Sequence, residues 1–371
     1  MKKRSVLLAA LLAAAALTGA AFAAGGDSAD PLISLDYLQS VFSARVDAAA
    51  DSRLDASDRS AYAKAEEAWR AALAAAEANA GAQRADVFTE AQLKRGDLLT
   101  GPTGLQVVVL AGEVTAQFPS GAVIDVTSGS EIKSGAQLSA NHRYLVAEDT
   151  TARFAVSGKS AVLNYCGLYV LSPSAATDYP AMAGALRALG LFRGSDTGYG
   201  SGFDLEKEPT RMEALIMLIR LLGEEEAAFR CTASHPFTDV PAWANAYAAY
   251  AYSMGYSNGV GPKIFGTAAP ASAEMYTEFL LRALGYSSTA QIDISDAPAR
   301  ARAAGVLTSG EAEALRTGSF LRADVVYLSY YALESNVSGG GTLSDALIAR
   351  GIFTASSYRD ACVLVTSARI G

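Results

Sequence analysis

Residues 237–286 read FTDVPAWANAYAAYAYSMGYSNGVGPKIFGTAAPASAEMYTEFLLRALGY, and this stretch decides the fold of the C-terminal half. Two segments, 245–254 and 273–284, have helix-forming composition, and each runs into a glycine, which is a common helix end. Between them, 256–266 is rich in Gly, Asn and Pro and is typical of a loop. The stretch predicts a helix–loop–helix unit, which is too small to bury its apolar faces alone.

The same pattern occurs before and after this stretch. The unit before it contains ALRALGLFRG (185–194), a Gly-rich loop, and PTRMEALIMLIRLLG (209–223). A degenerate unit after it begins at IDI (292–294) and starts its last helix at FLRAD (320–324). The predicted helix-ending glycines of the three units, Gly190, Gly255 and Gly305, are 65 and 50 residues apart. We therefore expect three similar units that pack on one another.

The motif Thr-Arg-x-Glu at 210–213 predicts a capped helix with a cation at its mouth. Thr210 follows Pro209, which favours extended backbone. The Thr210 hydroxyl can then cap the helix, and Glu213 completes a capping box. Arg211 remains at the positive helix end, where a guanidinium can bind a carboxylate through two hydrogen bonds. The alternative is that Arg211 pairs only with a local acid such as Glu208.

The other two units depart from this motif. The second keeps a cap at Ser272, but it has Ala273 in place of the Arg and Met275 in place of the Glu. In the third, Leu321 replaces the Thr, whereas Arg322 and Asp324 keep the charges. At most two of the three grooves between units are therefore equipped with the motif's charges.

Three further residues of the second unit are candidates for the binding site. Trp243 can stack on a sugar ring, although a Trp in this position is more often part of a core. Gly259 and Gly261 fit a loop that needs positive φ or a close backbone approach.

Together these motifs resemble the S-layer homology (SLH) family of bacterial envelope proteins. The resemblance rests on FTDVPAWA at 237–244, NGVG at 258–261 with Phe265, Thr-Arg-x-Glu at 210–213, and Arg-x-Leu-Gly-Tyr at 282–286, and it covers about half the chain, from Tyr179 to Phe353. It implies a pseudo-threefold helical prism that binds secondary cell-wall polysaccharide, often pyruvylated, in grooves between repeats. The residues that it assigns to polysaccharide binding are Thr210, Arg211, Glu213, Trp243, Gly259, Gly261, Arg322 and Asp324.

The N-terminus has the pattern of a secretory signal peptide. Lys2, Lys3 and Arg4 precede an apolar run over 6–22, which ends in Ala-Phe-Ala at 21–23. A membrane anchor is the alternative, but the run is short for a span and no cationic stop-transfer segment follows it. Cleavage removes three cations and changes the formal net charge from −8 to −8 − 3 = −11. We expect an exported, wall-associated protein without stable membrane insertion.

Two different zones lie between the signal and the repeats. After a linker with a short apolar docking segment at 31–42, residues 57–82 are rich in Ala, Glu and Arg and predict a helix from Ser57 or Asp58 to Gly81. Its weakly apolar stripe, which includes Tyr62 and Trp69, indicates a surface or spacer helix with one packed face or, alternatively, a self-associating coiled coil.

From 93 to 171, short Val- and Thr-rich runs alternate with Gly-containing turns and predict a small antiparallel β-sandwich or barrel. The predicted strands include 106–110, 114–118, 152–156 and 168–171, and one of the predicted turns is Ser157-Gly158. An enzymatic interpretation of this module makes His142 and Glu148 an acid–base pair. The alternative makes both residues turn and edge positions.

The composition argues against several classes of function. The acidic balance of the 371-residue chain disfavours nucleic-acid binding, which depends on basic patches. Two His and three widely spaced Cys leave no multi-His or CxxC metal site, and the Cys pattern favours buried small apolar residues over a disulfide framework. We expect no cofactor.

The sequence thus predicts a mixed α+β protein with several domains and a non-enzymatic function. SLH-like repeats would bind it non-covalently to anionic polysaccharide or peptidoglycan of the wall and display the β module. Two alternatives remain open: a wall-anchored glycan or peptide hydrolase with its site in the β module, and a self-assembling S-layer subunit. The predicted segments are a signal peptide (1–23), linker and docking segment (24–56), helix (57–82), β module (93–171), and repeats at 179–236, 237–291 and 292–371, the last with a C-terminal cap.

Export has a direct test. Mass spectrometry of the secreted or wall-extracted protein should find a new N-terminus at Ala24 or Gly25, because signal peptidase cleaves after small residues. A mature protein that still begins at Met1 would contradict the predicted localisation.

Overall fold

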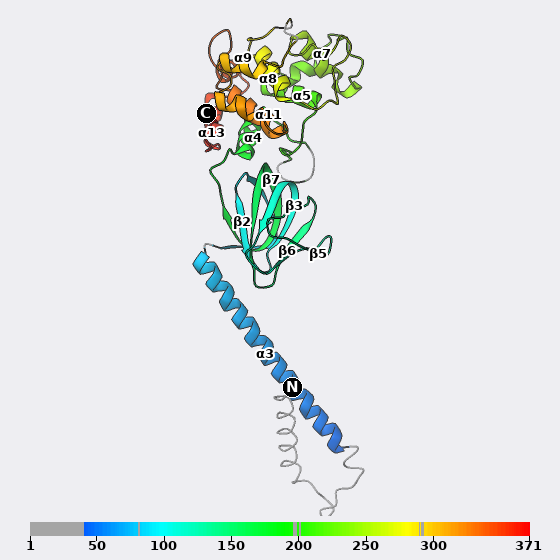
Figure 1. Ribbon diagram of the computed structural model, residues 1–371, viewed down its shortest axis with the longest axis vertical. Helices are drawn as coiled ribbons and strands as arrows, with labels where there is room; N and C mark the ends of the chain where they lie inside the picture. Colours follow the sequence, from blue (N-terminus) through cyan, green and yellow to red (C-terminus); the bar gives the residue numbers. More distant parts are fainter. Residues whose placement is uncertain (1–40, 81, 196–198, 200–201, 289, 291–292) are drawn as a thin grey trace, which may run out of the picture. The chain divides into compact units, whose positions relative to one another are not determined.

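The computed structural model describes residues 41–80, 82–195, 199, 202–288, 290 and 293–371 (Figure 1). The chain divides into two compact units, 1–81 and 82–371, which are considered separately below. The predicted signal peptide at 1–23 and nearly all of the docking segment at 31–42 lie outside the described residues. Among the described residues, no helix combines the length and the apolar character needed to cross a bilayer.

The first unit contains one long helix, α3, Ser43–Ala80. The prediction that this helix starts at Ser57 or Asp58 is wrong, because the 38-residue segment is rich in Ala and contains neither Gly nor Pro to interrupt it. Tyr62 and Trp69 of this stripe are 80% and 57% exposed. Gly81, the expected stop, lies outside the described residues, and Ala80 is the last helical residue.

The β module is a seven-stranded antiparallel sheet with the strand order β1-β7-β3-β6-β4-β5, and β2 also pairs with β7. This confirms the predicted antiparallel β structure. The sheet starts ten residues before the predicted boundary at 93. The strands are β1 Gln83–Lys94, β2 Leu98–Pro102, β3 Gln106–Gln117, β4 Ala122–Asp125, β5 Ser130–Ile132, β6 Arg143–Ala147 and β7 Thr151–Ser172.

Two predicted strand pairs are in fact single bent strands. β3 covers the expected strands at 106–110 and 114–118, and β7 covers those at 152–156 and 168–171. The turn expected at Ser157-Gly158 is wrong, because the β3–β7 register shifts there and the chain passes through an irregular step without reversing. Gly112 lies on the opposite side of this step with φ 88°. Alternate side chains along both strands point into one apolar core.

The C-terminal part is helical. Three 11-residue helices, α5, α8 and α11, each pack on the other two and form the centre of a second, larger apolar core. The shorter helices surround them, and α4 packs on α11 and α13. The helices are α4 Tyr179–Ala188, α5 Arg211–Leu221, α6 Glu225–Phe229, the 3₁₀ helix η3 Ala242–Ala244, α7 Asn245–Ser253, α8 Ala273–Ala283, α9 Ala297–Ala303, α10 Ser309–Ala314, α11 Arg322–Ala332, α12 Leu343–Ala349 and α13 Ala355–Val363.

Two similar backbone hydrogen bonds each join the start of one central helix to the segment before another, and we call these two places seams. At the first seam, the backbone N–H of Arg211 donates to the Ala269 carbonyl at 2.8 Å, in the segment that leads into α8. At the second, the N–H of Arg322 donates to the Lys207 carbonyl, also at 2.8 Å, in the segment that leads into α5. Each arginine is the first residue of its helix, so the two seams place their arginines in related positions.

The three cysteines, Cys166, Cys231 and Cys362, are free thiols of intermediate exposure. The expectation that they are fully buried is therefore wrong.

The bulge at Gly112 generates a stability prediction. An added Cβ would lie 2.3 Å from the Ser160 carbonyl oxygen, so Gly112→Ala should destabilise the β module by about 3 kcal/mol or more, through positive φ and steric overlap together. Gly129→Ala is the control. Gly129 has φ 71° with open space around its Cβ position and should cost only about 1–2 kcal/mol. Denaturant unfolding followed by circular dichroism measures both, and equal losses would contradict the steric argument.

Candidate functional site

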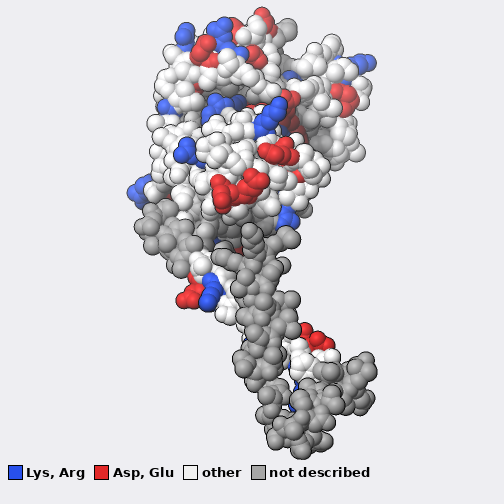
Figure 2. Space-filling model, turned by 60° about the horizontal axis from the view of Figure 1, so that its bottom comes forward, with Lys and Arg blue, Asp and Glu red and all other residues white. Residues whose placement is uncertain are grey.

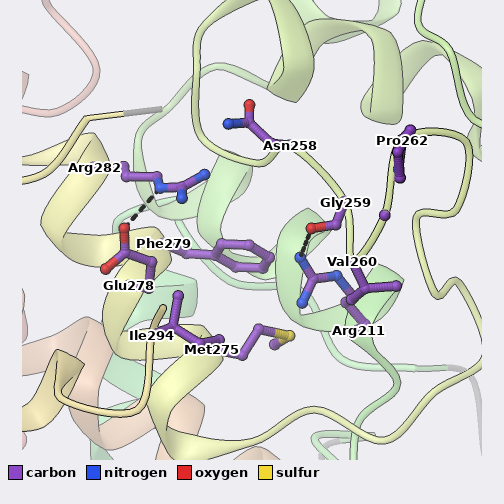
Figure 3. A pocket seen from close by; sticks show the side chains of 11 residues that line it. Arg211, Asn258, Gly259, Val260, Pro262, Met275, Glu278, Phe279, Arg282 and Ile294 are labelled. Atoms are coloured by element: carbon purple, nitrogen blue, oxygen red, sulfur yellow. Dashed lines mark hydrogen bonds and ion pairs between the residues drawn. The ribbon is translucent and has the colours of Figure 1, made fainter. Parts of the chain in front are cut away.

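A cavity of about 510 Å³ opens at the first seam, between the N-terminus of α5, the loop after α7 and helix α8 (Figure 3). Its walls come from α5, from the loop after α7, from α8 and from the segment before α9. The lining residues are Arg211, Asn258, Gly259, Val260, Gly261, Pro262, Met275, Glu278, Phe279, Arg282 and Ile294.

The cap of α5 orients Arg211. Thr210 is extended, with φ −72° and ψ 162°, and its hydroxyl accepts a hydrogen bond from the Glu213 N–H, while the Glu213 carboxylate accepts from the Thr210 N–H at 2.7 Å. The predicted capping box is therefore confirmed. Arg211, the next residue after the cap, extends across the seam, and its Nη2 donates to Ser257 Oγ at 3.2 Å and to the Gly259 carbonyl at 3.5 Å.

The Arg211 guanidinium is buried among aromatic rings. The residue is only 7% exposed, and the guanidinium carbon lies 5.2 Å from the centre of the Phe265 ring and 5.1 Å from that of Phe279. Such cation–π contacts offset part of the cost of removing the charge from water. Burial and the nearby charge of Arg282, opposed by the charge of Asp239, lower the pKa of Arg211 to about 10, so the guanidinium remains charged at neutral pH.

Arg211 has no carboxylate partner among the described residues. Its side chain donates to a hydroxyl and a carbonyl, and its buried Nε–H meets no acceptor among the described residues. The alternative that Arg211 simply pairs with Glu208 is thus wrong for this structure. A buried cation with an unmet donor, beside a cavity, is suited to binding an anion.

The other wall of the cavity is internally neutralised. Glu278 is 2% exposed and accepts from Arg282 Nε at 2.8 Å and from Arg300 Nη2 at 2.7 Å. Arg300 also pairs with Asp296 at 2.8 Å. Figure 3 shows the Phe279 ring between the ends of Arg282 and Arg211. The Glu278 carboxylate is thus paired with Arg282 in the wall and with Arg300 behind it, and it forms no ion pair with Arg211.

One of the two predicted loop glycines is explained by backbone geometry. Gly259 has φ 76°, and a Cβ there would lie 2.4 Å from the Ile264 carbonyl oxygen, as expected. Gly261 has neither positive φ nor a crowded Cβ position, so the same expectation is wrong for it. Both glycines line the cavity, and neither contributes a side chain to its wall.

Asp239 of the FTDVP motif fixes the segment that carries Phe265. Its carboxylate accepts hydrogen bonds from the backbone N–H groups of Phe265 and Gly266, both at 2.7 Å, and of Thr267 at 3.2 Å. Desolvation opposes ionisation, but these three donors outweigh it and lower the pKa of Asp239. The segment in turn supplies the Ala269 carbonyl that receives the Arg211 N–H.

The structure separates the remaining predicted residues from this cavity. Trp243 is 63% exposed and does not line it, so its interpretation as a core residue is wrong. Arg322 lies at the second seam, where its Nε donates to the Phe203 carbonyl at 3.1 Å. Asp324 is 7% exposed and accepts from the Leu321 N–H at 2.8 Å and from Lys159 of the β module. Arg322 and Asp324 therefore lie at the second seam and do not line the cavity that contains Arg211.

Sequence reasoning missed much of the cavity wall. Met275, Glu278 and Phe279 occupy one face of α8, and Arg282 follows one turn later. The Arg-x-Leu-Gly-Tyr motif at 282–286 was the available signal for Arg282, but the motif alone does not show that its arginine lines a cavity.

The β module does not form the acid–base pair that the enzymatic interpretation requires. His142 Nδ1 lies 2.7 Å from Asp125 Oδ2, not beside Glu148. Asp125 also accepts from the N–H groups of Thr127 and Ser128, which makes it a turn residue.

Comparison with known protein families and with curated proteins finds no match to this chain.

The role of Asp239 can be tested through pH. The pKa of Asp239 is lower in the folded state than the ordinary value of 3.8, so its ionised carboxylate stabilises the fold above pH 3.8. This stabilisation is lost as the pH falls through the folded-state pKa. Asp239→Asn should therefore lower stability at pH 7 by about 1–2 kcal/mol, since charged hydrogen bonds are partly screened here. The gap between parent and variant should narrow below pH 3.8 in thermal unfolding. A gap that is constant with pH would contradict the assignment.

Proposed function

We propose that this protein is a non-enzymatic, exported, cell-wall-associated protein whose helical part binds an anionic wall polysaccharide through the cavity at Arg211. The observation that carries the proposal is the Arg211 guanidinium itself, which is buried, charged, without a carboxylate partner, and directed along a cavity wall. A single carboxylate on a sugar, such as that of a pyruvate ketal, supplies the missing counter-charge.

The lining of the cavity also suits a sugar. Val260, Phe279 and Ile294 give apolar surface for the faces of a pyranose ring, while Asn258 and the backbone of the Gly259 loop offer polar groups for hydroxyls. Small-ligand sites commonly combine apolar walls with a few well-placed polar groups. The cavity volume is adequate for one or two sugar residues.

The arrangement of the helices supports the SLH-like interpretation. Three central helices pack on one another, and two of them begin with an arginine held across a seam by the same kind of backbone hydrogen bond. We propose that they represent three repeats around a pseudo-threefold axis. The position of the arginine in the remaining helix, α8, is taken by Ala273.

Surface charge does not provide an obvious alternative binding site on the visible face. Figure 2 shows acidic and basic side chains interspersed there, on a chain with a net charge of −8. Broad electrostatic attraction of an acidic polymer is disfavoured under these conditions. Recognition would therefore depend on the buried guanidinium, with the β module displayed outward from the wall.

The proposal is tested by sedimentation of the protein with purified native wall sacculi, before and after chemical removal of the wall polysaccharide. Arg211→Ala should weaken binding by about 10- to 150-fold, the equivalent of about 1.5–3 kcal/mol for a charged hydrogen-bonded contact. Arg211→Lys should recover only part of the loss, because an ammonium lacks the planar fork of the guanidinium.

Arg316→Ala is the matched control. It removes the same charge from a side chain that is 74% exposed, in a surface pair with Glu313 and outside the cavity. It should bind like the parent. Equal sedimentation of folded Arg211→Ala and parent protein, or undiminished binding to stripped sacculi, would refute the proposed function.

A further inference from the structure

The third residue of the helix is a carboxylic acid in α5 and α11 but a methionine in α8. In α5 this residue is Glu213, and in α11 it is Asp324; each accepts the backbone N–H of its own cap residue, at 2.7 and 2.8 Å. In α8 it is Met275. The Ser272 hydroxyl still accepts the Met275 N–H at 3.2 Å, but the reciprocal half of the capping box cannot form.

The seams bring this third position toward an arginine of the neighbouring unit. Arg322 bonds to the segment that leads into α5, whose third residue is Glu213. Burial lowers the pKa of Arg322, while the charges of Glu213 and Asp204 raise it, so the carboxylate at this third position acts on the arginine of the seam. The charge of Asp239 likewise raises the pKa of Arg211, but the Asp239 carboxylate is bonded to three backbone N–H groups. Arg211 bonds in the same way to the segment that leads into α8, whose third residue is Met275.

Met275 is part of the cavity that contains Arg211. It is 4% exposed, lines the same space as the guanidinium, and lies next to it in Figure 3. A carboxylate at this position would add a negative charge to the cavity that contains Arg211 and compete with any anion from outside.

We propose that Met275 is a specificity-determining residue: its apolar side chain adds no carboxylate to the cavity that contains Arg211, so that this seam accepts one carboxylate of an otherwise neutral sugar. The inference rests on the proposed function and adds the reason why this seam is the anion site. The loss of half a capping box in α8 is the structural cost of that specificity.

The test compares Met275→Glu with Met275→Gln in the full-length mature protein. Both side chains can complete the capping box with Ser272, and they differ only in charge. The probe is a methyl hexopyranoside that carries a pyruvate ketal, and its methyl ester is the neutral counterpart. Binding is measured by isothermal titration calorimetry, and folding by circular dichroism.

Met275→Gln should bind the carboxylate probe within about threefold of the parent, whereas Met275→Glu should lose about tenfold or more, as expected for a lost charge-assisted contact. Binding of the ester should be weak in all three proteins. Equal losses in both variants would show that the shape of Met275 matters rather than its lack of charge, and would overturn the inference. So would unchanged binding in Met275→Glu.

A second variant covers the case in which Met275→Glu does not fold. Asn258→Asp introduces a carboxylate of nearly the same shape into another part of the cavity wall, and it should also reduce binding of the carboxylate probe. Undiminished binding would overturn the inference. A parent protein that binds neither the probe nor sacculi would instead refute the proposed function, so the two failures are distinguishable.

Discussion

The helical part of this protein depends on the way in which one unit satisfies the helix end of its neighbour. The first backbone N–H groups of an α-helix have no partner within the helix. In α5, the N–H of Arg211 is satisfied by the Ala269 carbonyl of the next unit, and in α11 the N–H of Arg322 is satisfied by Lys207. Each seam is therefore held in part by a backbone N–H and a backbone carbonyl that satisfy each other.

This constraint also explains why a charged side chain is buried at each of these two seams. A helix that starts inside a seam carries its first side chain inside as well, and burial of a guanidinium is costly unless polar or aromatic groups surround it. For Arg211 the surroundings include two phenyl rings, a hydroxyl and a carbonyl, and no carboxylate of the described residues forms an ion pair with it. The charge is tolerated but incompletely satisfied, which is the physical basis of the proposed affinity for an anion.

Local chemistry made part of the fold and site predictable. The Thr210–Glu213 capping box and the positive φ of Gly259 depend on residues close in sequence, and both follow from side-chain type and spacing. The position of Arg211 at a helix mouth followed from the same motif. The start of α3 was predicted too late, because Ser57 resembles a cap but nothing before it breaks the helix.

The rest depends on tertiary contacts that spacing does not reveal. Met275 looked like a defect of the second repeat, and only the cavity shows that it faces Arg211. The pairing of Glu278 with Arg300 joins residues 22 positions apart across two units. Likewise, Ser157-Gly158 has the composition of a turn, and only its pairing with β3 shows that the strand continues. The three-repeat interpretation itself remains a prediction.

The contact of Lys159 with Asp324 has a mechanical consequence. The β module and the helices have separate apolar cores, and the side-chain contacts that join them include this ion pair and the hydrogen bond from Ser160 to Glu206. Polar contacts of this kind resist shear less than a shared core does. If the helices are fixed to a wall and the β module is pulled by the flow of the medium, we expect this junction to yield first. The junction would then act as a compliant joint that lets the outer module reorient while both cores stay folded.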